Sequence, residues 1–171
     1  HSFPTRRSSD LGLVLIAKNP YVQEALTVQH HTREWTKKYL CLVTGVVPEL
    51  EGRIDEPIAR VGNGSRARII STEGKSAITL WELVETFTGA SLVRAELVTG
   101  RTHQIRVHFA HIGHPLIGDD VYGSPSPLIT RQALHAAEVR FTHPISRSIV
   151  HLNCPLPEDM QGLQQYLRLL P

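Results

Sequence analysis

The 171-residue sequence predicts one α+β domain with a mixed, largely antiparallel sheet flanked by helices. Two pairs of strand-like segments are each joined by a short turn, as in antiparallel hairpins. Helix-like segments lie before, between and after these pairs, and no repeat or linker divides the chain. Apolar residues make up 41% of the sequence and charged residues 20%, which is typical of a folded protein with a hydrophobic core.

The first elements are expected from residue 12 onward. Residues 12–17 form a short continuous apolar run, which predicts a strand covered on both faces. Pro20 stops it because proline cannot donate to a strand ladder. Residues 21–32 predict a helix because four residues recur at helical spacing. These are Val22, Ala25, Leu26 and Gln29.

Residues 36–45 predict a second strand, in which alternate side chains point to opposite faces. One face carries Tyr39, Cys41 and Val43, and the other carries Leu40 and Leu42.

Residues 49–74 are rich in glycine, proline, arginine and asparagine, which favours loops and short ribbon strands. Arg60, Arg66 and Arg68 form a basic patch within this segment. It is equally compatible with phosphate binding and with a solvated charged loop.

Two hairpins and two helices are expected in the second half. The first hairpin pairs residues 77–86 with 91–98, and the second pairs 132–141 with 148–153 and turns at His143-Pro144. Residues 102–112 predict a helix stopped by Gly113 and Pro115, and a last helix opens at Pro157 and continues to about Leu169.

Charge and cysteine usage limit the location without defining the function. The net charge of +2 permits a polyanionic partner but does not demand one. No apolar run approaches the roughly 20 residues that span a bilayer, and no signal peptide is evident. We therefore expect no membrane partner. Cys41 and Cys154 lie far apart and fit no metal spacing, so we expect free thiols in a reducing cytoplasm.

The helix expected at 102–112 places an arginine at the edge of its apolar stripe. Ile105, Phe109 and Ile112 form that stripe, and Arg106 lies about 100° from Ile105. An arginine at such a margin needs an anionic partner or loses hydration free energy. We therefore expect Arg106 to hold a carboxylate or phosphate; the alternative is a side chain that extends to solvent.

Histidines and aspartates around this helix allow other chemistry. The histidines are His103, His108, His111 and His114. Their spacing puts no two histidines on one i,i+4 face, so we expect no metal site. We expect His103 to hydrogen-bond at the helix start and His114 to bond locally. Asp119 and Asp120 could act as paired acid and base, but adjacent loop aspartates more often accept local backbone N–H bonds.

Several segments, in the right order, resemble the RluA family of pseudouridine synthases. Residues 99–123, TGRTHQIRVHFAHIGHPLIGDDVYG, are similar to its third signature motif, and KYLCLVTG at 38–45 is similar to its second. Three further segments resemble the family: GLVLIAKN at 12–19, GKSAIT at 74–79 and RQALHA at 131–136. The resemblance implies the pseudouridine synthase catalytic-domain fold for residues 12–171.

The resemblance also implies residue roles. Tyr39 would stack on the target base, and Arg106 would pair with the catalytic aspartate. Four residues at the start of the signature helix would help to shape an RNA-facing cleft: Arg101, Thr102, His103 and Gln104. Family members flip a uridine out of structured RNA, break its glycosidic bond with help from the aspartate and rejoin the ring through C5. We expect ribosomal or transfer RNA as partner, a monomer, and no metal or organic cofactor.

The family's first motif, His-Arg-Leu-Asp-x-x-Thr-Ser-Gly, is not found in this sequence. When its final glycine is aligned with Gly12, the catalytic aspartate falls at Arg7, and Asp10 lies three residues too late. Residues 1–11 can be back-translated into a common sequencing-library adapter, which predicts a non-native leader on an N-terminally truncated catalytic domain.

An arginine in place of the aspartate removes the nucleophile and puts a cation where Arg106 expects an anion. We therefore expect the chain as written to be inactive, with exposed sheet edges and poor solubility. A non-catalytic RNA-binding protein that retains the cleft is the main alternative. A metal-dependent hydrolase that uses the histidines is a weaker one.

Overall fold

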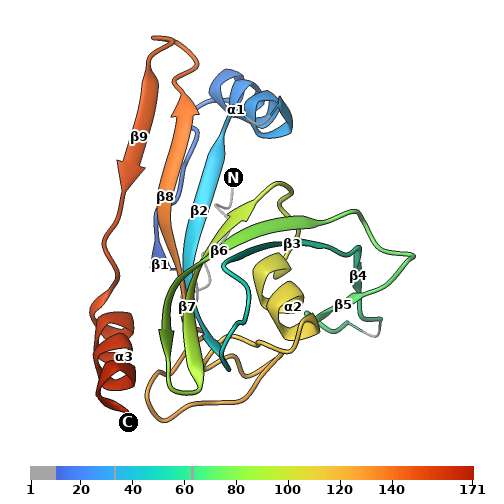
Figure 1. Ribbon diagram of the computed structural model, residues 1–171. Helices are drawn as coiled ribbons and strands as arrows, with labels where there is room; N and C mark the ends of the chain where they lie inside the picture. The colour runs from blue at the N-terminus through green and yellow to red at the C-terminus, as the bar shows by residue number, and fades with distance from the viewer. Residues whose placement is uncertain (1–10, 33, 63) are drawn as a thin grey trace.

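A seven-stranded sheet runs through the molecule in a computed structural model that describes residues 11–32, 34–62 and 64–171 (Figure 1). The elements in chain order are β1 Leu11–Gly12, α1 Pro20–Thr32, β2 Thr36–Thr44, β3 Glu51–Asp55, β4 Ile58–Arg60, β5 Arg68–Ile70, β6 Ile78–Phe87, β7 Ala90–Leu97, α2 Gln104–His111, β8 Leu134–Thr142, β9 Ile149–Asn153 and α3 Glu158–Leu169.

The strand order is β1-β8-β2-β7-β6-β3, with β9 also paired to β8. The pairing of β1 with β8 is parallel, and the other pairs in this sheet are antiparallel. The predicted α+β class with a mixed, largely antiparallel sheet is therefore confirmed. No helix in the described part of the chain is long and apolar enough to span a membrane.

Both predicted hairpins are present. β6 and β7 pair across the turn at Thr88-Gly89, and β8 pairs with β9 after the chain turns beyond His143. The predicted last helix is α3. The segment expected to hold loops and short strands contains β3 and a separate two-stranded sheet of β4 and β5.

The strand expected at residues 12–17 is wrong beyond Gly12. The ladder with β8 ends there, apart from the Leu13 N–H bond to the carbonyl of Ala136 at 2.9 Å. Leu13, Leu15 and Ala17 pack against a small core beside α1, whereas Val14 and Ile16 are exposed. The run is apolar because one side packs on that core, so continuous hydrophobicity did not indicate a strand covered on both faces.

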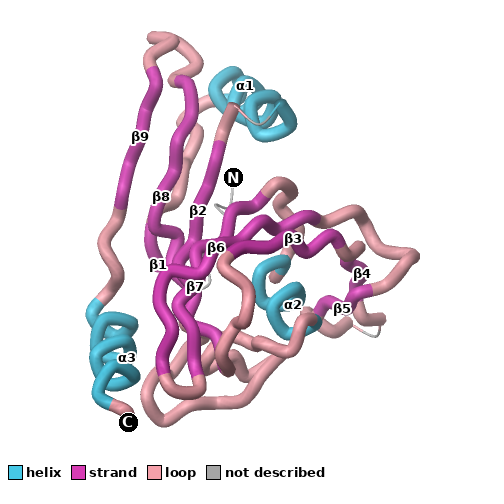
Figure 2. Tube along the Cα trace, viewed as in Figure 1, coloured by secondary structure: helices cyan, strands magenta, loops and turns pink. Residues whose placement is uncertain are grey.

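Each face of the sheet carries a core under one helix (Figure 2). Cys41 and Val43 of β2 contribute to the core with α2, and Leu42 contributes to the core with α3. This confirms the predicted alternation of faces along β2.

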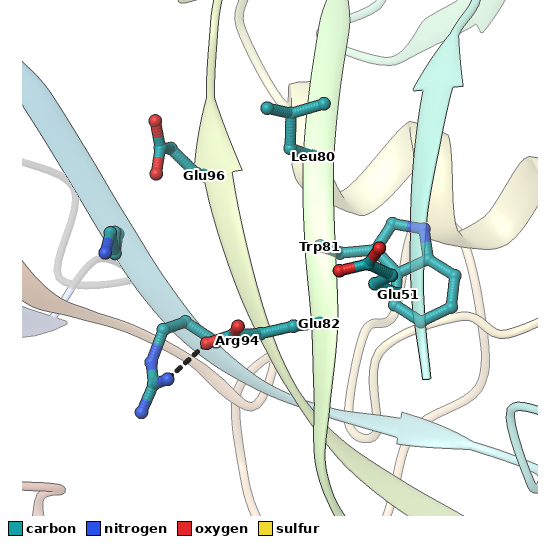
Figure 3. A pocket seen from close by; sticks show the side chains of 7 residues that line it. Glu51, Leu80, Trp81, Glu82, Arg94 and Glu96 are labelled. Carbon is teal, nitrogen blue, oxygen red and sulfur yellow. Dashed lines mark hydrogen bonds and ion pairs between the residues drawn. The ribbon is translucent and has the colours of Figure 1, made fainter. Parts of the chain in front are cut away.

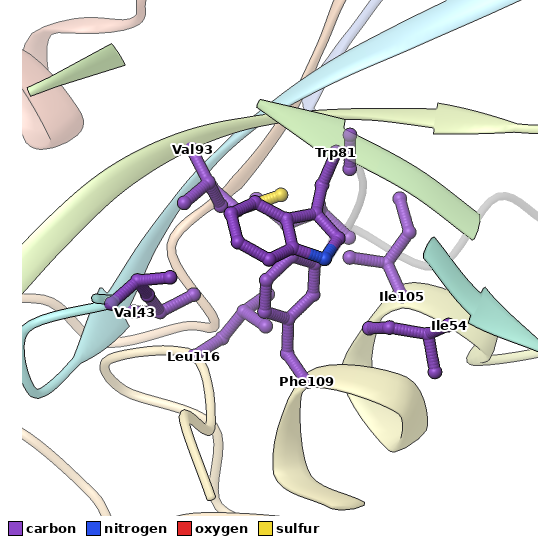
Figure 4. Close-up of a cluster of buried hydrophobic side chains, with 11 residues drawn as sticks. Val43, Ile54, Trp81, Val93, Ile105, Phe109 and Leu116 are labelled. Carbon is purple, nitrogen blue, oxygen red and sulfur yellow. The ribbon is translucent and has the colours of Figure 1, made fainter. Parts of the chain in front are cut away.

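Phe109 is the largest fully buried side chain of the core under α2, and its ring meets Trp81 edge-on at 6.3 Å between centroids (Figure 4). Ile105 joins the same core. Ile112 was predicted to belong to this stripe, and that prediction is wrong. α2 ends at His111 and the chain turns away at Gly113, which leaves Ile112 37% exposed.

Candidate functional site

Arg106 is buried on α2 and bound by a carboxylate. Its Nε donates to Oδ2 of Asp119 and its Nη2 donates to Oδ1, both at 2.6 Å. Only 8% of Arg106 is exposed, and Asp119 is fully buried. The alternative of an arginine extended into solvent is therefore excluded. The predicted anionic partner is present as Asp119, and the pairing of Arg106 with a catalytic aspartate stays a prediction.

The loop after α2 positions this carboxylate. Gly118 has φ 76°, and a Cβ there would collide with the carbonyl oxygen of Arg131, so the turn requires glycine. Oδ1 of Asp119 also accepts the backbone N–H groups of Val121 and Tyr122, each at 3.0 Å. The predicted local bonding of this aspartate is confirmed. The bidentate pair with Arg106 was missed, because sequence spacing alone does not show which loop returns to the helix.

Both members of the pair remain charged. Burial raises the pKa of the Asp119 carboxyl, but the hydrogen bond from Arg106 and the two backbone N–H bonds outweigh it and hold the pKa below its ordinary value. Burial likewise lowers the pKa of Arg106, and the bonds and charge of Asp119 more than reverse this effect. The guanidinium also lies 5.0 Å from the ring centroid of Tyr122, a cation–π contact.

Tyr122 ties the start of α2 to the β4–β5 hairpin. Its hydroxyl accepts the backbone N–H of Arg68 at 2.8 Å and bonds Nδ1 of His103 at 2.8 Å. His103 occupies the N-cap position with φ 59°, but its side chain caps no backbone N–H group of the helix. His103 therefore hydrogen-bonds at the helix start as predicted, but its partner is the Tyr122 hydroxyl and not the helix backbone. His114 bonds locally as predicted, to the carbonyl of Thr44 at 2.9 Å.

The other residues of the signature divide into exposed and interior groups. Arg101 and Thr102 are exposed, and their role at an RNA-facing surface stays a prediction. Gln104 is only 2% exposed, and its amide bonds Thr79 and Thr99. It also bonds the backbone of Arg101 and Ile78. Gln104 thus supports from inside the loop that enters α2. The prediction that it helps to shape an open cleft is wrong.

His108 belongs to the same buried network. Its Nε2 bonds the carbonyl of Glu56 at 3.0 Å and must donate, so Nδ1 accepts from the Thr79 hydroxyl at 2.9 Å. Both ring nitrogens are therefore occupied in the neutral form. No group of three potential metal-ligating side chains occurs among the residues that the structure describes.

A pH dependence follows from His108. Its burial lowers the pKa of the imidazole, more than the bond to Glu56 raises it. The neutral ring stabilises the fold fully above the unfolded-state pKa of about 6.5. As the pH falls below that value, the unfolded chain gains the proton first, so stability declines. We expect the free energy of unfolding to decline as the pH falls below about 6.5, with a slope of at most about 1.4 kcal/mol per pH unit.

Urea unfolding at several pH values measures this effect. His108→Gln should flatten the decline, whereas His151→Gln, at an exposed histidine, should not. An unchanged pH profile in His108→Gln would contradict the assignment.

A cavity of about 400 Å³ adjoins Arg106 and is also lined by His103, Asp120, Arg131 and Gln132. The parallel register of β1 on β8 pairs Leu11 with His135, which puts the N-terminal end of β1 near the chain that enters β8 at Gln132. The predicted positions Arg7 and Asp10 lie outside the described residues. The start of β1 is thus paired three residues along the chain from Gln132, which lines the cavity that holds Arg106.

Tyr39 lies on β2 with Cys41 and Val43, on the α2 side of the sheet. It packs against the core that contains Ile105, the neighbour of Arg106. Nζ of Lys37 lies 5.1 Å from its ring centroid. Tyr39 and the helix of Arg106 therefore share one face of the sheet.

A smaller cavity of about 180 Å³ has a mixed charge (Figure 3). Three glutamates line it together with Lys38 and Arg94, and Arg94 is bound to Glu82. This balance of charges does not favour a polyanionic ligand.

Comparison with known proteins defines the class. The family model described as RNA pseudouridylate synthase matches residues 11–111. The chain belongs to this family, and the fold and the signature residues around Arg106 agree with that membership.

Named relatives extend the comparison. A Bacillus subtilis (strain 168) protein called uncharacterized RNA pseudouridine synthase YlyB is 40% identical over 158 residues, which cover 92% of this chain and 52% of the relative. Ribosomal large subunit pseudouridine synthase D of Nitrosomonas europaea is 42% identical over 169 residues, with 94% and 49% covered. The chain thus spans about half the length of the curated relatives it matches.

A solved structure supports the fold. Human RNA pseudouridylate synthase domain containing 1 superposes with a TM-score of 0.67 at 28% identity, covering 90% of this chain and 74% of that one.

Proposed function

We propose that the chain is part of an enzyme that isomerises uridine to pseudouridine in structured RNA, either ribosomal or transfer RNA, and that it acts as a monomer in the cytoplasm. The observation that carries this proposal is the buried, carboxylate-bound Arg106 beside a cavity, within a chain of the RNA pseudouridylate synthase family.

Arg106 is suited to orient a second carboxylate. A guanidinium has five N–H donors, and Asp119 accepts from Nε and Nη2. The remaining donors are available on a side chain that lines the cavity. A catalytic aspartate entering from the N-terminal end of β1 would approach this side of the sheet, where Arg106 would pair with it.

Tyr39 would supply the face on which the flipped base stacks. Stacking of a base on an aromatic ring contributes about 1–3 kcal/mol and tolerates different bases. The ring is partly buried on the same sheet face as α2, which supports this role.

The chain as written would nevertheless be inactive, because the aligned position of the nucleophile holds Arg7. A second candidate function is RNA binding without catalysis. The Arg106–Asp119 pair favours it, since the arginine is neutralised within the chain and its cavity does not depend on the missing aspartate for charge balance.

Tritium release from RNA labelled at uridine C5 tests both candidates. Isomerisation breaks the C1′–N1 bond and forms a C1′–C5 bond; C5 releases its hydrogen as a proton, and N1 takes up a proton from solvent. We expect the purified chain to bind ribosomal or transfer RNA without releasing tritium. Release that disappears in Arg106→Ala would contradict inactivity and support the enzyme. Failure to bind RNA would contradict both functions.

A further inference from the structure

A second cavity of about 400 Å³ lies at the junction of the β4–β5 hairpin and the loop that enters α2. Its walls come from three segments, two of them close in sequence and the third about 25 residues further along the chain. These are the hairpin with Arg60 and Arg68, the loop with Lys75, and the loop with Arg101 and Thr102.

The lining is strongly cationic. Four basic side chains, Arg60, Arg68, Lys75 and Arg101, share it with one carboxylate, Glu73. Within the described ranges, none of these four cations forms an ion pair, whereas Arg94 and Arg168 elsewhere each bind a glutamate. Like charges that converge without counter-ions favour an anionic ligand.

Backbone contacts hold the walls in place. Ile58 and Lys75 exchange two backbone hydrogen bonds at 2.9 Å, and a Cβ on Gly74 would lie 2.5 Å from the carbonyl carbon of Ile58. Nε of Arg101 donates to the carbonyl of Ser76 at 2.9 Å, and Nη1 of Arg68 donates to the carbonyl of Arg66. Two of the guanidinium groups are thus anchored before any ligand arrives.

This cavity adjoins the one that holds Arg106. Thr102 lines the cationic cavity, and the next residue, His103, lines the Arg106 cavity. Tyr122 fixes their separation, because its hydroxyl bonds both the backbone N–H of Arg68 and the ring of His103. An anion held beside Arg68 would therefore lie at a set position relative to Arg106.

We infer that this cationic cavity binds a backbone phosphate of an RNA strand whose target nucleotide enters the Arg106 cavity. The inference rests on the proposed function, because a polymer that occupies both cavities is what links them. A phosphate contact would position the strand and would carry no sequence preference.

The test is the salt dependence of binding to a short fluorescent stem-loop RNA that contains uridines. Each lost phosphate contact makes the negative slope of log affinity against log salt shallower by about 0.7–0.9. At 0.1 M salt this corresponds to about a fivefold loss of affinity. Arg60→Gln and Lys75→Gln should each show this loss, and Lys75→Arg should retain the slope. Arg140→Gln, at an exposed arginine of β8, makes the same charge change outside the cavity and should not alter the slope.

The outcomes separate this inference from the proposed function. If the unmodified chain binds the RNA but both glutamine variants match Arg140→Gln, the phosphate site is wrong and the proposed function stands. If the unmodified chain does not bind the RNA, both are wrong. Displacement of the RNA by millimolar inorganic phosphate would overturn the assignment to a backbone phosphate in favour of a free-anion site.

Discussion

Replacing Asp119 with asparagine is expected to lower the free energy of unfolding by about 3–5 kcal/mol, because it leaves the Arg106 cation buried without a counter-charge. The side chains form a bidentate pair with both bonds at 2.6 Å; Arg106 is 8% exposed and Asp119 is fully buried. Asparagine has nearly the same shape, and its oxygen can still accept the N–H groups of Val121 and Tyr122. The substitution therefore removes the charge and leaves the local turn bonds.

Asp120→Asn is the matched control. The side chain of Asp120 is 75% exposed, and its Oδ1 lies 3.9 Å from Nη2 of Arg106. An exposed contact of this kind contributes less than about 1 kcal/mol. Chemical unfolding of the two variants measures the difference, and equal losses would show that Asp119 does not neutralise a buried arginine.

Replacing Phe109 with alanine is expected to cost about 3–5 kcal/mol, because the cavity left behind cannot collapse fully. Phe109 is fully buried at the centre of the core between α2 and the sheet, where it meets Trp81 edge-on. Phe109 lies on α2, and Trp81 lies on β6, which is paired with a strand on each side. The midpoint of urea unfolding should fall accordingly.

Ile112→Ala is the control for this prediction. Ile112 was predicted to share the stripe of Phe109 but is 37% exposed after the end of α2. Its truncation should cost less than about 1 kcal/mol, since little apolar surface is uncovered. A loss at Ile112 as large as that at Phe109 would contradict the end of α2 at His111 and the exposed position of Ile112.

The sequence was informative wherever the pattern was local. The turn at Thr88-Gly89 between two β-branched segments predicted the β6–β7 hairpin, and strict alternation placed Cys41 and Leu42 in different cores. Both depend on period-two geometry that adjacent residues impose on each other.

Prediction failed where a distant partner decides the outcome. Residues 12–17 are as apolar as a central strand, yet the ladder with β8 stops after Gly12 and only one side of the run is packed. Nothing within those residues specifies how far β8 will pair with them. The burial of Ile112 was likewise misjudged: the helix stops before Gly113 as predicted, but the side chain of Ile112 does not reach the core.

The candidate site was predicted in part. The margin position of Arg106 predicted that it would need an anion, and Asp119 was correctly given local backbone bonds. Their pairing depends on how the loop after α2 folds back across 13 residues of sequence, which helical periodicity does not describe. The turn at Gly118, directly before a pair of aspartates, is the sequence signal that could have indicated an inward carboxylate.

A double-mutant cycle on Arg106 and Asp119 tests most directly the claim that these two residues form one buried unit at the site. The free energy of unfolding would be measured for Arg106→Gln, Asp119→Asn and the double variant. We predict a coupling energy of about 2–3 kcal/mol. The free energy of unfolding of the double variant should then be only slightly lower than that of the less stable single variant. Single effects that add within about 0.5 kcal/mol would contradict the account.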